Sequence, residues 1–155
     1  MALGIIERAT LAIVSRSKFP EAAVLGLRKL ETRFPPGRTG LTKALELSQR
    51  KDWPSRYLAG KVLGRSVDID AAVVIQELVR LAEDSDRFVR EGSAFGFGMA
   101  WLGADGELRE RILKVVRQEG PAQRRAIAFS AVAVMRNSKH ISLHDIVPLL
   151  EEALV

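Results

Sequence analysis

The sequence predicts an all-α fold in which consecutive pairs of helices stack into a single solenoid. Every convincing apolar segment repeats with the period of a helix, and no segment alternates between apolar and polar residues as a strand would. In addition, Arg56, Arg90 and Arg125 stand at three similar helix starts, spaced by 34 and 35 residues. A period of this length with two helices per unit is typical of stacked helical repeats.

The N-terminal part of the chain contains three predicted helices. The first covers about residues 3–15, and its apolar residues share one face: Ile5, Ile6, Ala9, Ala12 and Ile13. The second begins at Phe19-Pro20, because proline suits the first turn of a helix, and runs to about Phe34. Pro35-Pro36-Gly37 ends it, and a third helix covers roughly residues 39–51.

Three further helices occupy the middle of the chain. The fourth opens at Asp52-Trp53-Pro54 and ends near Gly64. The fifth is capped by Asp68 or Asp70, reaches Glu83 and is amphipathic on one side only. The sixth lies in the segment 84–103, DSDRFVREGSAFGFGMAWLG, which starts with an acidic turn and the pair Val89-Arg90.

The C-terminal part contains the last three predicted helices. The seventh runs from about residue 104 to 118, and the eighth from about 122 to 136. Ser142 caps a ninth, with Asp145 placed to complete a capping box. Because Pro148 falls inside this segment, the helix either kinks there or begins later than Ser142.

The repeat extends over nearly the whole chain, which we therefore treat as a single domain of residues 1–155. Small residues follow the three repeated arginines at a constant distance: Gly64, Gly98 and Ala133. Glycine is costly inside a helix, so the glycines of the sixth helix predict that helices approach closely there. The alternative is that they line a surface for a ligand or partner. These glycines are Gly92, Gly96, Gly98 and Gly103.

The segment LVRLAEDSDRFVREGSAFGFGMA resembles a HEAT-type repeat, in which an Asp-bearing turn precedes a Val-Arg pair that opens the inner helix. WPSRYLAGKVLG and AQRRAIAFSAVAV are similar to the inner half of such a repeat. The resemblance implies a right-handed α-α superhelix of about nine helices, arranged as four pairs plus a C-terminal helix. It also implies that certain residues bond neighbouring repeats as a ladder: Asp84, Asp86, Arg90 and Arg125.

Composition and motifs exclude several classes of function. The chain has no cysteine, which excludes disulfides and thiolate chemistry. Ser93 does not lie in a nucleophile elbow, and Gly96-Phe97-Gly98 lacks the third glycine of a dinucleotide loop. His140 and His144 are four residues apart and could share a metal, but we favour exposed or capping histidines. We expect no catalytic residue, cofactor or metal.

We expect a cytoplasmic protein that is not inserted in a membrane. The first apolar stretch contains Glu7 and Arg8, unlike a signal peptide, and the longest uncharged run, residues 92–104, is too short to span a bilayer. The net charge of +5 permits nucleic-acid binding. Dispersed arginines in surface ion pairs are the alternative interpretation of this charge.

The sixth and eighth helices carry no charge over long stretches, between Glu91 and Asp105 and between Arg125 and Arg136. A helix that is apolar on all sides is normally covered on all sides. Either the solenoid curls enough to cover these helices or another molecule does. Our first hypothesis is a non-enzymatic scaffold that binds a protein partner or a second copy of itself through four residues: Phe97, Trp101, Phe129 and Val132.

The alternative hypothesis is nucleic-acid binding. The helix starts containing Trp53, Phe88 and Arg124-Arg125 resemble those of the AlkD-type DNA alkylation-repair proteins, which hold DNA on a basic concave surface. No helix start combines tryptophan with the arginine pair, so the resemblance assigns no catalytic residue. Cations at the inner-helix starts could bind phosphates, and the nearby aromatic side chains could stack on bases or pack in the core. The predicted contacts are Arg56, Lys61, Arg65, Arg90, Arg124 and Arg125.

Overall fold

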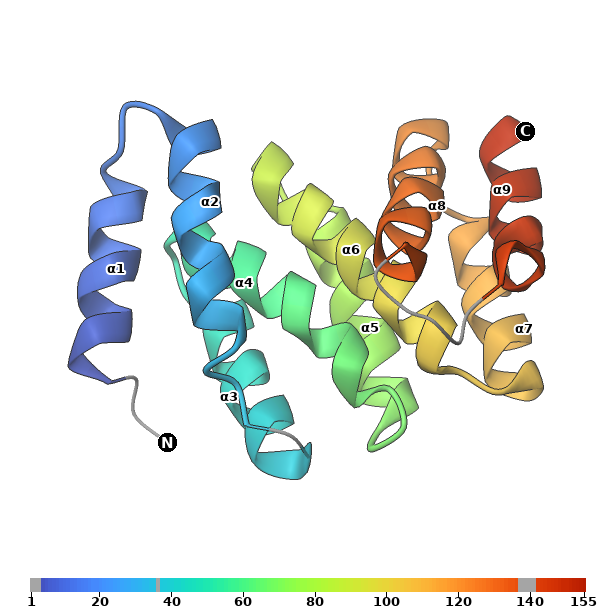
Figure 1. Cartoon of the computed structure of the whole chain (residues 1–155), viewed down its shortest axis with the longest axis horizontal. Coiled ribbons are helices and arrows are strands. Elements are labelled where there is room, and N and C mark those ends of the chain that lie inside the picture. The colour runs from blue at the N-terminus through green and yellow to red at the C-terminus, as the bar shows by residue number, and fades with distance from the viewer. Residues whose placement is uncertain (1–3, 36, 137–141) are drawn as a thin grey trace.

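The computed structural model of the chain describes residues 4–35, 37–136 and 142–155, and these residues form nine α-helices with no β-strand among them. In Figure 1 the helices follow one another across the molecule, from α1 (Ile5–Ser15) at the N-terminal end to α9 (Val147–Leu154) at the C-terminal end. The all-α fold class predicted from the helical periodicity is confirmed.

Alternate helices form one layer of the stack, which we call the inner layer. Its members are α2 (Pro20–Glu31), α4 (Trp53–Leu63), α6 (Arg87–Gly103) and α8 (Pro121–Met135). The linking helices are α3 (Gly37–Ser48), α5 (Ala71–Ala82) and α7 (Gly106–Val116). Helix α6 is central, because it packs against α4, α5 and α8, and α2 packs in turn against α4 (Figure 1). This packing agrees with a helical superhelix.

Aspartate side chains cap four consecutive helices, α4 to α7. The Oδ1 atom of Asp52 accepts the backbone N–H of Ser55 at 3.1 Å, and that of Asp70 accepts the N–H of Val73 at 3.2 Å. Asp86 and Asp105 cap α6 and α7 in the same way. Each cap satisfies a backbone donor that has no partner inside the helix. Of the two caps proposed for the fifth helix, the structure selects Asp70.

The last helix starts after Ser142. Ser142 precedes a short 3-10 turn, η2 (Leu143–Ile146), and its backbone N–H donates to Asp145 Oδ2 at 2.9 Å. Helix α9 follows, and Pro148 falls in its first turn, where the missing proline N–H costs no hydrogen bond. The later of the two predicted starts is therefore correct.

The glycines of α6 allow close approach to its neighbours. Gly92 and Gly96 face α4, and Gly98 faces α8. A Cβ atom added at Gly92 would lie 2.6 Å from the carbonyl oxygen of Tyr57, and one added at Gly98 would lie 2.8 Å from a backbone nitrogen of α8. The predicted close packing is confirmed at these three positions. It does not hold at Gly103, which is exposed near the end of α6.

Helix α1 turns the apolar stripe predicted for it to solvent and packs on the fold through Leu11 and Val14 instead. Ile5 is 79% exposed and Ile13 is 72% exposed, whereas Glu7 is buried with Leu11. The ammonium group of Lys43 on α3 lies 2.7 Å from Glu7 Oε1, and both side chains are almost fully enclosed. The apolar stripe predicted for this helix exists, but a buried ion pair lies at the interface where that stripe would normally pack.

Candidate binding site on the inner layer

The arginines at the starts of α4 and α6 hold backbone turns. Arg56 binds the carboxylate of Asp84 and also donates to the carbonyl oxygens of Arg50 and Lys51. Arg90 donates to the carbonyl oxygen of Asp84 at 2.7 Å. Because Asp84 belongs to the helix pair after that of Arg56, the Arg56–Asp84 contact joins successive repeats. The ladder role expected of Asp84 is therefore seen. Arg90 instead binds the turn before its own helix, and Asp86 caps that helix, so the ladder role implied for these two residues is not seen. Arg56 and Arg90 are both occupied within the fold.

The start of α8 differs from this pattern. Arg125 is exposed and forms no ion pair with any described residue, so the ladder role implied for it is not seen. Arg124 is half-buried, and its Nε atom has no hydrogen-bond partner in the part of the chain that the structure describes. Gln123 makes the contact to the preceding repeat instead, because its side-chain amide donates to the carbonyl oxygen of Arg90 at 3.2 Å.

Two of the four residues predicted to bind a partner belong to the core. Phe97 is 0% exposed and Trp101 is 3% exposed. Helices α4, α5 and α8 cover the uncharged faces of α6, and Trp101 donates its indole N–H to the carbonyl oxygen of Asp145 at 2.7 Å. The prediction for these two side chains is wrong, because the chain itself supplies the cover. Phe129 is exposed, and Val132 is half-buried.

Side chains from all four helices of the inner layer, together with Arg65 just after α4, line a pocket of about 370 Å3. We call it the inner pocket. Its lining contains Lys61 and Arg65, which the sequence predicted as binding residues, and other residues that it did not. The lining residues are Arg28, Glu31, Lys61, Arg65, Phe95, Met99, Ala133 and Val134.

Lys61 is fixed on one side of this pocket. Its Nζ atom lies 2.6 Å from Glu31 Oε1, and only 10% of the Lys61 side chain is exposed. The same Nζ lies 4.4 Å from the centre of the Phe95 ring and 5.7 Å from that of Tyr57. An acid and two aromatic faces thus compensate this buried cation for the loss of water.

The two arginines of the pocket are less constrained. Arg65 Nη1 donates to the backbone carbonyl of Glu31 at 3.1 Å, and its Nη2 lies 3.5 Å from the Glu31 carboxylate. The Arg65 side chain is 39% exposed. Arg28 is exposed and forms no ion pair with any described residue. Both guanidinium groups therefore retain donors for a ligand.

Tyr57 is buried beside Lys61 of the inner pocket. Burial raises the pKa of its phenol far above the usual value, and the nearby charges of Glu31 and Glu91 raise it further. Its ring packs edge-on against Trp53, which stacks on Phe88 with ring centres 5.1 Å apart. Tyr57 and Phe88 are buried, so the core-packing interpretation is correct for these two aromatic residues.

The repeat spacing offers a way to find the pocket residues that we did not predict. Glu31, Arg65, Met99 and Val134 follow one another at intervals of 34, 34 and 35 residues. They therefore occupy one equivalent position in successive repeats, and in the structure all four line the inner pocket. This position changes from charged in the first two repeats to apolar in the last two.

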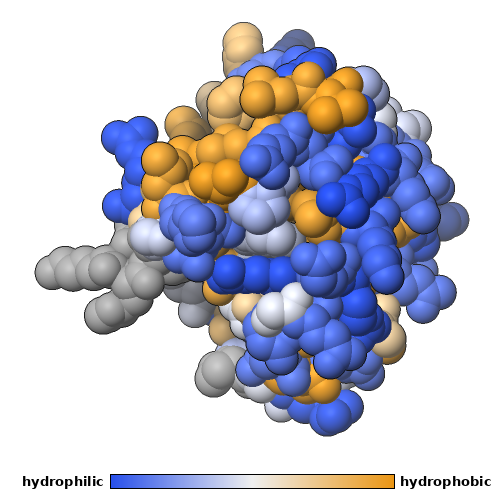
Figure 2. Space-filling view, turned by 90° about the vertical axis from the view of Figure 1, so that its right-hand side faces the viewer, coloured by the Kyte–Doolittle hydropathy of each residue, from blue (hydrophilic) through white to orange (hydrophobic). Residues whose placement is uncertain are grey.

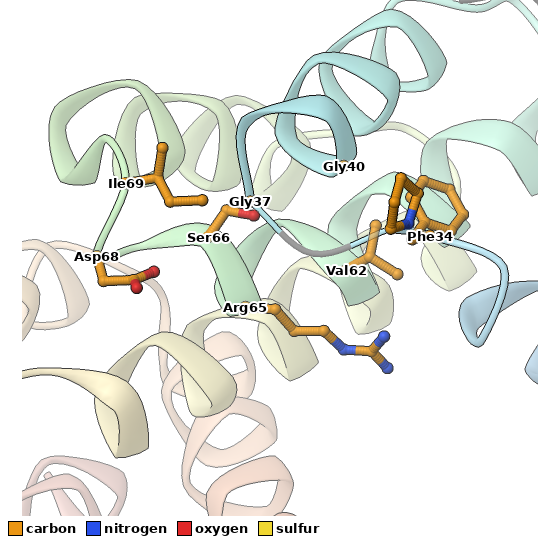
Figure 3. A pocket seen from close by; sticks show the side chains of 9 residues that line it. Phe34, Gly37, Gly40, Val62, Arg65, Ser66, Asp68 and Ile69 are labelled. Carbon is orange, nitrogen blue, oxygen red and sulfur yellow. The ribbon is translucent and has the colours of Figure 1, made fainter.

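A second pocket lies on the other side of Arg65 and has a volume of about 440 Å3. Figure 3 shows Asp68 and Ile69 along one side of it and Phe34 on the other, with the Arg65 side chain extending away. Its charged lining residues are Arg65 and Asp68. We regard the inner pocket as the better candidate, because four charged side chains and an apolar wall meet there.

The remaining predicted features do not form a site in the described residues. His140 lies outside them, and His144 is exposed on η2. Within residues 4–35, 37–136 and 142–155, no three His, Asp or Glu side chains are grouped so that they could hold a metal ion. The hydroxyl group of Ser93 is buried and donates to the carbonyl oxygen of Leu78 at 2.6 Å. No helix in the described part has the length and apolar composition needed to cross a bilayer.

Comparison of the chain with models of protein families, with curated proteins and with solved structures gives no significant match.

Proposed function

We propose that the chain is a non-enzymatic binding module that engages a protein partner through its inner layer. The observation that carries the proposal is the exposure of Phe129, whose side chain is 69% accessible. Phe129 lies one helical turn before Ala133, which lines the inner pocket, so the two residues share a face of α8. The exposed ring therefore adjoins the pocket.

The residue types around the pocket support a protein partner. Aromatic residues, methionine and arginine are enriched at protein interfaces, and this surface contains Phe95, Met99 and Phe129 beside Arg28 and Arg65. Further apolar side chains are exposed at the C-terminal end of the stack. Figure 2 views this end and shows an apolar area next to a larger hydrophilic one. The partner is another protein or a second copy of this chain.

Site-specific photocrosslinking in the cell of origin tests this proposal. A photoreactive phenylalanine analogue at position 129 should give a discrete adduct with a protein, identifiable by mass spectrometry. The matched control places the same analogue at Arg111, an exposed position of α7. Equal adducts at both positions, or none at position 129, would contradict the proposal.

Two glutamate substitutions distinguish a residue of the proposed interface from a residue of the core. Phe129→Glu should weaken binding of the protein identified by crosslinking and leave the unfolding midpoint almost unchanged, because the ring already contacts water. Phe97→Glu places a charge in a fully buried position and should unfold the chain. Circular dichroism of the two variants checks this difference.

Nucleic-acid binding is the second candidate function. It is favoured by the convergence of Arg28, Lys61 and Arg65 on one pocket and by exposed Arg125 at the start of α8. This function predicts affinity for an oligonucleotide that falls steeply with salt, with a log–log slope of about −0.7 to −0.9 per neutralised phosphate. Absence of binding at low ionic strength would remove it. A cytoplasmic location is part of both proposals.

A further inference from the structure

We propose that the inner pocket binds the carboxylate of an acidic side chain of the partner, with an apolar side chain of the same segment beside it. The inference rests on the proposed function, because it specifies the chemistry of the protein segment that the inner layer takes. It follows from the distribution of charge, hydrogen-bond donors and apolar groups around the pocket.

The charge of the pocket favours an anion. Three cations, Arg28, Lys61 and Arg65, surround a single acid, Glu31. Lys61 and Glu31 are 2.6 Å apart and almost fully buried, so they largely neutralise each other. The charge that remains toward solvent is that of the two arginines.

The donors of these arginines suit a carboxylate. A guanidinium group has five N–H donors arranged to bind both oxygens of a carboxylate. Arg65 directs Nη1 and Nη2 toward Glu31 and keeps its other donors, while Arg28 donates to no described residue. An incoming carboxylate can therefore bind without breaking the Lys61–Glu31 pair.

The apolar wall specifies what must accompany the acid. The apolar wall comes from α6, with Phe95 and Met99, and from α8, with Ala133 and Val134. The charged residues come from α2, from α4 and from Arg65 just after α4. A bound segment must therefore present an acidic group toward α2 and α4 and an apolar group toward α6 and α8. The volume of about 370 Å3 is near the lower end of the usual range for binding pockets, which suits side chains.

A nucleic-acid backbone is a poorer match to this surface. A phosphate backbone needs a row of available cations along its path, but Arg56 and Arg90 are hydrogen-bonded to turns of the protein, and Lys61 is ion-paired with Glu31. The available positive charge is local and lies beside apolar groups. This arrangement favours one carboxylate over a polyanion.

Selection from a phage-displayed library of random linear peptides tests the inference while the partner is unidentified. Peptides selected on the purified full chain should be enriched in Asp or Glu next to Leu, Ile or Phe. Their affinities, measured by fluorescence anisotropy, should fall about tenfold or more in Arg28→Gln and in Arg65→Gln, as expected for lost hydrogen bonds between charged groups. Arg111→Gln on α7 is the matched control and should bind normally.

The variants must be shown to fold. Arg28 is exposed and forms no side-chain hydrogen bond or ion pair with any described residue, so Arg28→Gln should nearly retain the wild-type unfolding curve. Arg65 also bonds the Glu31 backbone; Arg65→Lys, which keeps the charge but loses the planar donor geometry, therefore serves as a second variant. Peptide binding should weaken in Arg65→Lys as well.

The outcomes separate this inference from the proposed function. If selected peptides lose affinity in Phe129→Glu but lack acidic residues and bind both arginine variants normally, the inference fails and the protein-binding function stands. If the library gives no peptide whose binding depends on Phe129, both lose support. If a single-stranded oligonucleotide displaces the peptides and its affinity falls steeply with salt, the ligand of the inner pocket is a nucleic acid and the inference fails.

Discussion

Arg56 and Asp84 join two successive helix pairs through a two-point contact. Arg56 Nε lies 2.7 Å from Asp84 Oδ2, and Arg56 Nη2 lies 3.2 Å from Asp84 Oδ1. The Arg56 side chain is 16% exposed and that of Asp84 is 10% exposed, so the pair is largely shielded from water. The guanidinium group also binds the turn before α4, so one side chain ties this turn to the turn before α6.

Breaking this pair should destabilise the fold. We expect Arg56→Gln and Asp84→Asn each to lower the free energy of unfolding by about 2–4 kcal/mol, because each leaves a shielded charge without its partner. Denaturant unfolding of the two variants and of the double mutant measures the coupling. Arg50→Gln is the control, because the Arg50 side chain is 46% exposed in its pair with Asp52. Arg50→Gln should lower the free energy of unfolding by less than about 1 kcal/mol. A similar loss in all variants would contradict the stabilising role given to the Arg56–Asp84 pair.

The same carboxylate should make the fold sensitive to acid. Burial alone would raise the pKa of Asp84, but hydrogen bonds from Arg56 and the backbone of Asp86 outweigh it and hold this pKa below its ordinary value. Between the folded pKa and about pH 4, Asp84 is therefore more protonated in the unfolded chain than in the folded one. The stabilisation is complete above that pH and is lost as the pH falls through the folded pKa. Unfolding curves over an acid series should show a shallower loss in Asp84→Asn than in the wild type.

Glycine at the crossing of α4 and α6 should be required by packing. A Cβ atom at Gly96 would collide with the carbonyl oxygen of Gly60 and lie 2.5 Å from the Leu78 side chain. We expect Gly96→Ala to destabilise the chain by about 1–3 kcal/mol. Gly26 in α2 is the matched control, because a Cβ there meets no atom within 4 Å. Gly26→Ala should stabilise the chain by about 0.5–1 kcal/mol. The thermal unfolding midpoint should therefore fall in Gly96→Ala and rise in Gly26→Ala.

Tyr57 allows a spectroscopic test of burial, because it is the single tyrosine of the chain. With its pKa raised by burial, the folded state keeps the phenol protonated above the ordinary value of about 10. Stability from this group is present below that pH and is lost as the pH rises toward the folded pKa. Ultraviolet absorbance should therefore report ionisation together with loss of helical circular dichroism. Reversible ionisation near pH 10 with full helicity would show that the phenol is accessible.

Local signals in the sequence predicted most of the secondary structure. The apolar period of α5 and the aspartates before α4 to α7 define helices because the residues that decide them lie within a few positions of each other. The 34–35-residue spacing likewise identified equivalent positions along the stack. The boundaries were less accurate: α2 ends at Glu31, short of Phe34, and α3 begins at Gly37 and ends at Ser48.

By itself, the sequence determined that the chain is helical, roughly where its helices begin and end, and which positions repeat. The tertiary structure decided which faces are covered. It buried Phe97 and Trp101 within the stack, exposed Ile13 and brought Glu31 to Lys61. The physical reason is that helix periodicity and capping are local properties, whereas burial and ion pairing depend on groups supplied by other helices, about 30 residues away in the case of Glu31 and Lys61.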